Sequence, residues 1–106
     1  MGEKMNFCGG HIYWAKAVMF FDANLYDKAK EAGAKALEIF EKEQVVYSDL
    51  PNLYILVGQV CEIQKAYSEA VRYYNHALEI MKESNHYELS RIEQFSQHIN
   101  QILNKC

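Results

Sequence analysis

Residues 26–39 read YDKAKEAGAKALEI, and residues 67–80 read YSEAVRYYNHALEI. Six of the paired positions are identical at a displacement of 41 residues, including the closing Ala-Leu-Glu-Ile of each stretch. The same displacement carries Tyr13 onto Tyr54 and Ala17 onto Gly58. Self-similarity at a fixed period is typical of repeat architectures. The sequence therefore predicts two copies of a unit of about 41 residues, followed by a C-terminal tail.

Each unit is predicted to form two helices, because its apolar residues recur at intervals of three and four. In the first unit this pattern begins at Ile12, breaks at 22–24 and resumes from 26 to about 46. The second unit starts at Ser48-Asp49-Leu50-Pro51, where a capping side chain precedes a proline in the first turn. A turn is expected near Gln64-Lys65.

The predicted fold class is all-α, and the chain is expected to form a single domain over residues 1–106. The first repeat covers about residues 10–43, the second about 51–84, and an amphipathic capping helix about 87–104. Ala17 and Gly58 lie midway along the first helix of each pair. Small side chains at such positions allow two helices to approach closely.

The composition supports this class and excludes others. Half of the residues are hydrophobic, which is more than a disordered chain contains, and one proline and five glycines are too few for the turns of an all-β fold. The net charge is −3 without a basic block, so nucleic acid is not an expected partner. No apolar run approaches the ~20 residues that span a bilayer, so a membrane is not expected either.

The cysteines indicate a reducing compartment. Cys8, Cys61 and Cys106 are odd in number and widely spaced, unlike a disulfide framework. The residues 1–6 are too polar for a signal peptide, so a cytoplasmic location is expected. Cys61 falls inside an apolar helical pattern and is predicted to be buried, whereas Cys106 is expected to be exposed.

No catalytic, metal or cofactor site is predicted. Cys8-Gly9-Gly10-His11 supplies half of a metal-ligand spacing, and no second pair completes four ligands. The histidines His76, His86 and His98 are scattered, and neither paired carboxylates nor a Cys/His/Asp arrangement stands out. The sequence therefore favours a protein that is not an enzyme.

The two units resemble the tetratricopeptide repeat, whose pattern is W-x2-L-G-x2-Y, then A-x3-F and P. The first unit reads Tyr13-x2-Lys16-Ala17-x2-Phe20 and Ala29-x3-Gly33, and the second reads Tyr54-x2-Val57-Gly58-x2-Cys61 and Ala70-x3-Tyr74. The resemblance covers about residues 10–84. It implies antiparallel helical hairpins stacked as a short α-solenoid with a C-terminal capping helix.

The chain departs from that pattern at several positions. Lys16 stands where the family prefers leucine, and Gly33 where it prefers an aromatic residue. Lys65 occupies a turn position where glycine is common, and a left-handed lysine would cost about 1–2 kcal/mol, so another turn shape is expected there. The period of about 41 residues resembles the kinesin-light-chain style of array, and also the arrays of bacterial peptide-pheromone receptors.

The resemblance implies non-enzymatic binding of a peptide segment or a partner helix. In this family the first helix of each pair lines a concave groove. The groove residues carried over to this chain are His11, Trp14, Val18, Phe21, Asp22, Asn52, Ile55, Gln59, Glu62 and Ile63. Asn52 and Gln59 suit an extended backbone. Trp14, Val18 and Leu56 stand at positions where some members of this family bind the C-terminal carboxylate of a partner with polar and basic side chains. An acidic C-terminal tail is therefore not the expected ligand.

Two alternatives remain open at this stage. The apolar stripe of Trp14, Val18 and Phe21 could pack against the preceding segment, through Met5 and Phe7, as ordinary core. The chain could also be a self-associating homodimer or part of a longer array, because repeat proteins usually need three or more units for stability.

Overall fold

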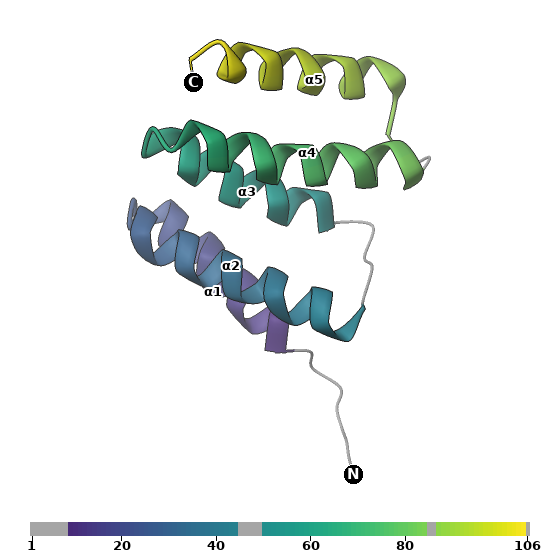
Figure 1. The fold of residues 1–106 in the computed structure, drawn as a ribbon. Helices are drawn as coiled ribbons and strands as arrows, with labels where there is room; N and C mark the ends of the chain where they lie inside the picture. Colours follow the sequence, from purple (N-terminus) through teal and green to yellow (C-terminus); the bar gives the residue numbers. More distant parts are fainter. Residues whose placement is uncertain (1–8, 45–49, 85–86, 106) are drawn as a thin grey trace. The chain divides into compact units, whose positions relative to one another are not determined.

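The computed structural model describes residues 9–44, 50–84 and 87–105. Its helices are α1 (Gly9–Asp22), α2 (Tyr26–Glu43), α3 (Leu50–Ile63), α4 (Tyr67–Ser84) and α5 (Leu89–Leu103) (Figure 1). The described residues contain no strand, which confirms the predicted all-α class. The chain divides into two compact units, Met1–Val46 and Tyr47–Cys106, and each is described by itself.

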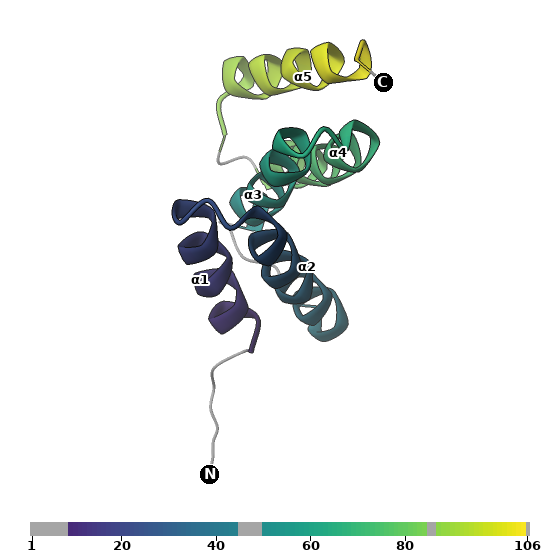
Figure 2. The same cartoon turned by 90° about the vertical axis from the view of Figure 1, so that its left-hand side faces the viewer.

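In the first unit, α1 and α2 pack along each other as a helical hairpin (Figure 2). Ala17 on α1 and Ala36 on α2 are fully buried, as expected for helices in close contact. Gly10 marks a second close approach, because a Cβ atom there would lie 2.7 Å from the Phe40 ring. Phe40 is fully buried and fills this end of the hairpin.

In the second unit, α3 packs on α4, and α4 also packs on α5. A Cβ atom on Gly58 would lie only 2.6 Å from the ring of Tyr74, so the two helices require glycine there. Cys61 is fully buried, as predicted. Cys8 and Cys106 lie outside the described residues.

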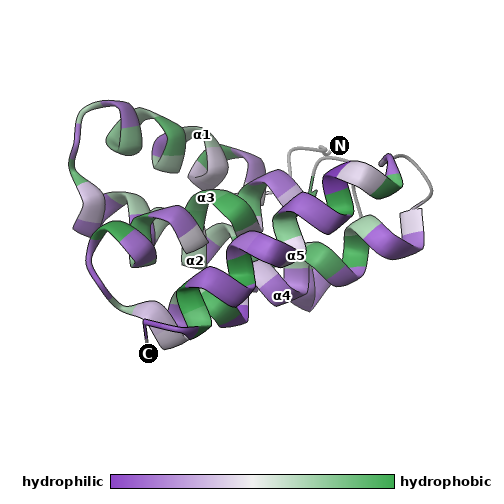
Figure 3. Cartoon of the chain, turned by 90° about the horizontal axis from the view of Figure 1, so that it is seen from above, coloured by the Kyte–Doolittle hydropathy of each residue, from purple (hydrophilic) through white to green (hydrophobic). Residues whose placement is uncertain are grey.

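Helix α5 is the predicted amphipathic helix. Ile99 and Ile102 are buried, while Glu93, Gln97 and Gln101 are exposed. Apolar and polar residues accordingly alternate along this helix in Figure 3, where it is coloured by hydropathy. The preceding helix, α4, ends at Ser84, where the sequence predicts the end of the second repeat.

Both hairpin turns contain a left-handed residue that is not glycine, Asn24 (φ 63°) and Lys65 (φ 65°). In the second turn, Ala66 donates its N–H to the carbonyl of Cys61 at 2.8 Å, and Lys65 donates to that of Glu62 at 3.0 Å. Matching bonds close the first turn. The prediction that Lys65 would avoid this conformation is wrong, because the two backbone hydrogen bonds of the turn offset its cost.

The C-terminal end of α2 also differs from the sequence prediction. α2 ends at Glu43 and not near Val46, because Gln44 is left-handed (φ 56°) and donates its N–H to the carbonyl of Glu41. Pro51 is the second residue of α3, which confirms a proline in the first turn. Ser48 and Asp49, predicted to cap this helix, lie outside the described residues.

Candidate interaction surfaces

Five of the predicted groove residues lie on α1, where they share one face. His11, Val18 and Asp22 are exposed, whereas Trp14 and Phe21 are half-buried. We call His11, Trp14, Val18, Phe21 and Asp22 the α1 stripe. Val18 is 41% exposed, so its side chain is accessible to a partner.

The aromatic side chains of the α1 stripe are fixed by contacts with α2. The Trp14 ring meets the edge of Phe40 at 6.0 Å between centroids, and His11 meets the same ring at 5.4 Å. His11 and Trp14 also stack, with an interplanar angle of 13°. Such edge and stacked contacts are favourable geometries for aromatic pairs. Trp14 is therefore held in place beside the exposed Val18.

The other five predicted residues lie on α3, each 41 positions after its counterpart on α1. Asn52, Gln59 and Ile63 are exposed, and Ile55 and Glu62 are half-buried. This second set, the α3 stripe, is more polar than the first. The two stripes belong to different compact units. Their arrangement along one common groove therefore stays a prediction.

Glu62 has a role inside the second unit that the sequence did not reveal. Its Oε1 accepts a hydrogen bond from the hydroxyl of Tyr74 at 2.9 Å, and Nε2 of His98 lies 3.0 Å from the same oxygen. One carboxylate thus joins α3 to both α4 and α5. The sequence predicts His98 only as one of several scattered histidines, since no local pattern relates residues 36 positions apart.

These contacts shift the pKa values of Glu62 and Tyr74. Burial alone would raise the pKa of Glu62, but the hydrogen bonds from His98 and Tyr74 outweigh it and hold the pKa below its usual value. The charge of Lys105 acts in the same direction. Burial, together with the bond to Glu62, raises the pKa of Tyr74 well above its usual range. Tyr74 therefore remains a neutral donor, and Glu62 an ionised acceptor, near neutral pH.

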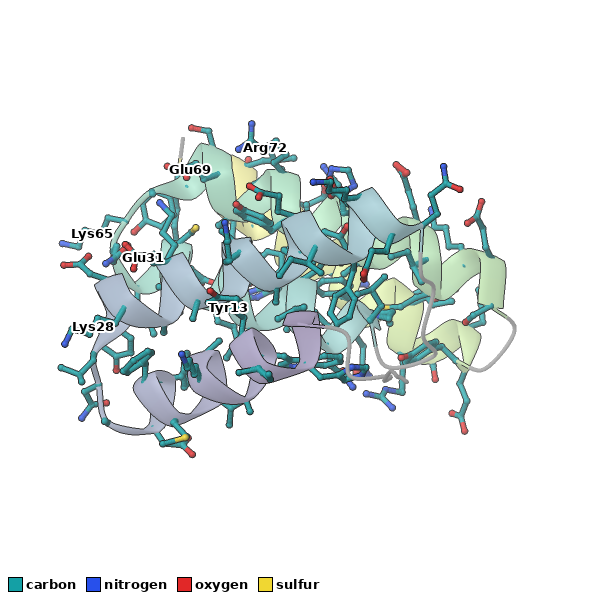
Figure 4. The ribbon with its side chains drawn as sticks, turned by 90° about the horizontal axis from the view of Figure 1, so that it is seen from below. Tyr13, Lys28, Glu31, Lys65, Glu69 and Arg72 are labelled. Carbon is teal, nitrogen blue, oxygen red and sulfur yellow. The ribbon has the colours of Figure 1, made fainter. Side chains whose placement is uncertain are left out.

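A groove of about 890 Å³ lies on the first unit and was not predicted. Its lining residues are Tyr13, Lys16, Met19, Phe20, Lys28, Glu31, Ala32, Ala34, Lys35 and Glu38. In Figure 4, Tyr13 lies between α1 and α2, and Lys28 and Glu31 extend from α2. Tyr13 and Phe20 are only half-buried.

Two lysines of this groove lie over aromatic rings. Lys16 Nζ is 5.3 Å from the centroid of Tyr13, and Lys28 Nζ is 5.8 Å from that of Phe20. At this distance a cation is attracted to the face of a ring. The sequence contains one signal for this open face, because Lys16 stands where the repeat pattern has leucine.

The described residues form neither a metal-binding cluster nor a membrane-spanning helix. No three His, Cys, Asp or Glu side chains among residues 9–44, 50–84 and 87–105 are grouped to hold a metal ion. Cys8, half of the weak metal spacing, lies outside these ranges. Within the same ranges no helix is long and apolar enough to cross a bilayer.

Comparison with known protein families identifies a match over most of the chain. The family model of the tetratricopeptide repeat matches residues 10–83, which include α2, α3 and nearly all of α1 and α4. No curated protein and no solved structure matches the chain.

Proposed function

Because the chain belongs to the tetratricopeptide-repeat family, whose repeats generally form non-catalytic protein-interaction modules, we propose that it binds a peptide segment or partner helix. Binding would use the exposed faces of the first helices, the α1 stripe and the α3 stripe. We propose no enzymatic activity for the chain. Repeat proteins of this architecture commonly bind through surfaces formed by successive units.

The observation that carries this proposal is the pairing of Trp14 with Val18 on α1. Val18 is exposed, and Trp14 is held beside it by the edge of Phe40. Tryptophan is among the residues that most often dominate binding energy at interfaces, and the accessible Val18 extends the apolar surface beside it. The partner would therefore insert an apolar side chain at this point.

The polar residues of the stripes suggest the rest of the partner's chemistry. Asn52 and Gln59 are exposed on α3 and could hydrogen-bond an extended backbone. Asp22 is exposed at the C-terminal end of α1 and could select a basic residue. Glu62 is a weaker candidate for that role, because its Oε1 already accepts bonds from Tyr74 and His98.

Three finer features belong to the same proposal. The chain would act as a single domain, in the cytoplasm, and its repeats would be of the long, kinesin-light-chain type. The displacement of 41 residues between the hairpins supports the long period. The buried thiol of Cys61, which is not in a disulfide, is compatible with a reducing compartment.

The experiment begins with selection of binding peptides from a displayed random library against the whole chain. The affinity of a selected peptide is then measured by calorimetry for wild type, Val18→Gln and Met19→Gln. The two variants are matched, because both replace an exposed apolar residue of α1 on neighbouring positions that face different sides.

We expect Val18→Gln to weaken binding about tenfold or more, since one well-placed contact contributes over 1 kcal/mol. Met19→Gln should leave the affinity within about twofold. Emission from Trp14, the only tryptophan, should change on binding. Equal affinities for wild type and Val18→Gln, or selected peptides that leave Trp14 emission unchanged, would overturn the proposal.

A further inference from the structure

The outer face of α2 carries a regular pattern of charge. Lys28, Glu31, Lys35 and Glu38 follow one another at intervals of three, four and three residues, so they form one row along the helix. All four are exposed and line the groove of the first unit. We call them the α2 charge row. Within the helix, Lys35 Nζ lies 3.6 Å from Glu38 Oε1.

The α2 charge row is complementary to its own reverse. Positions 28 and 38 are equally far from residue 33, and so are positions 31 and 35. A two-fold axis near residue 33 would lay a second α2 antiparallel to the first, with Lys28 facing Glu38 and Glu31 facing Lys35. A parallel arrangement would instead set each charge against its own copy. Closed dimers are built on such two-fold, self-complementary surfaces.

The groove beside this row has an apolar floor. Tyr13, Phe20 and Ala32 line it, and Met19 at its edge is 68% exposed. Lys16 and Lys28 place their charges over the rings of Tyr13 and Phe20. An apolar centre with a charged rim is the usual composition of a protein–protein interface.

The equivalent positions of the second hairpin are buried. The positions 41 residues after Lys16, Met19 and Phe20 are Val57, Val60 and Cys61, and all three are fully buried. These positions are thus buried in the second hairpin, whereas Lys16 and Met19 are exposed and Phe20 is half-buried in the first. The apolar side chains at these positions are therefore available for contact with a partner in the first hairpin.

We propose that this groove and the α2 charge row form a homodimer interface, occupied by the same surface of a second copy of the chain. The row holds two lysines and two glutamates, so it offers no net attraction to a strongly acidic or basic partner, but it matches its own antiparallel copy at every position. This surface is separate from the α1 stripe, whose residues do not line the groove.

The first test is the mass of the intact chain by sedimentation equilibrium across a range of concentrations. Wild type should approach twice the 12.4 kDa of one chain as the concentration rises. The double variant Lys28→Glu/Lys35→Glu sets like charges against each other and should raise the dissociation constant about a hundredfold, since like-charge contacts at interfaces cost several kcal/mol. Circular dichroism confirms that each variant remains helical.

A charge swap and a matched control make this test specific. Lys28→Glu/Glu31→Lys/Lys35→Glu/Glu38→Lys restores complementarity, and it should dimerise with itself but not with wild type. Lys65→Glu/Lys82→Glu makes the same change in net charge on the second unit, where both lysines are exposed, and should dimerise as wild type does.

Zero-length carbodiimide cross-linking locates the contact. Lys28 and Glu38 are ten residues apart on one helix, which separates them by about 15 Å, too far for a direct amide bond within one chain. A cross-link between them in a mixture of isotopically light and heavy protein must therefore join two copies. A monomer at all concentrations, a dimer unaffected by the double variant, or a dimer without this cross-link would each overturn the proposal.

Discussion

Gly58→Ala tests how closely α3 and α4 pack. The added Cβ atom would lie 2.6 Å from Cε1 and 2.7 Å from Cδ1 of Tyr74, whereas ordinary contact begins at 3.4 Å. The ring must then move by about 0.8 Å, the difference between 3.4 and 2.6 Å. Tyr74 is fully buried, bonded to Glu62 and in edge contact with Phe95 at 5.3 Å, so it has little room to move.

The expected net effect is a loss of stability. Overpacking of a buried site costs about 1–3 kcal/mol, and alanine in place of a helical glycine returns about 0.5–1 kcal/mol. Gly58→Ala should therefore lower the free energy of unfolding by up to about 2.5 kcal/mol. Each kcal/mol corresponds to a melting temperature lower by about 4–8 °C in a domain of this size. Urea and thermal unfolding followed by circular dichroism measure both quantities.

Two controls separate the ring contact from other effects of the substitution. Gly9→Ala places its Cβ atom 3.6 Å from Ile39, an ordinary contact, and should cause no loss. In a Tyr74→Leu background the ring is absent, so the cost of Gly58→Ala should shrink or change sign. A Gly58→Ala protein at least as stable as wild type, or an equal cost in both backgrounds, would refute the reasoning.

Two further substitutions give distinct expectations. The lowered pKa of Glu62 means that its stabilising contribution is complete above the unfolded-state pKa of about 4.3 and is lost as the pH falls through the folded-state value. Glu62→Gln should therefore reduce stability at pH 6 by about 1 kcal/mol and reduce it less at pH 3, as urea midpoints at the two pH values would reveal. Lys65→Gly relieves a left-handed lysine and should stabilise the chain by about 0.5–1 kcal/mol, whereas Ala66→Gly should not; thermal unfolding distinguishes them.

The hairpins could be predicted from the sequence because their signals are local. The matched small residues, such as Ala17 and Gly58, and the apolar intervals specify which helix faces meet. The same intervals place Cys61 in the core, where the structure has it. Lys65 was judged on its intrinsic preference alone, which the hydrogen bonds of the turn override.

The features that were missed depend on contacts between residues that are distant in the sequence. The bond from His98 to Glu62 requires α5 to dock on the second hairpin, and no periodicity encodes that docking. The groove of the first unit has one signal in the sequence, since Lys16 stands where the repeat pattern has leucine. Its volume and lining, however, appear only once α1 and α2 are packed.

Partner binding at α1 is tested most directly by nuclear magnetic resonance, because Trp14 supplies the only indole N–H signal of the chain. Titration of the labelled chain with a selected peptide should shift this signal, together with the amide signals of His11 and Val18. Amides of the α2 charge row should not shift. An unchanged indole signal at saturating peptide, with shifts confined to other helices, would contradict binding at the α1 stripe.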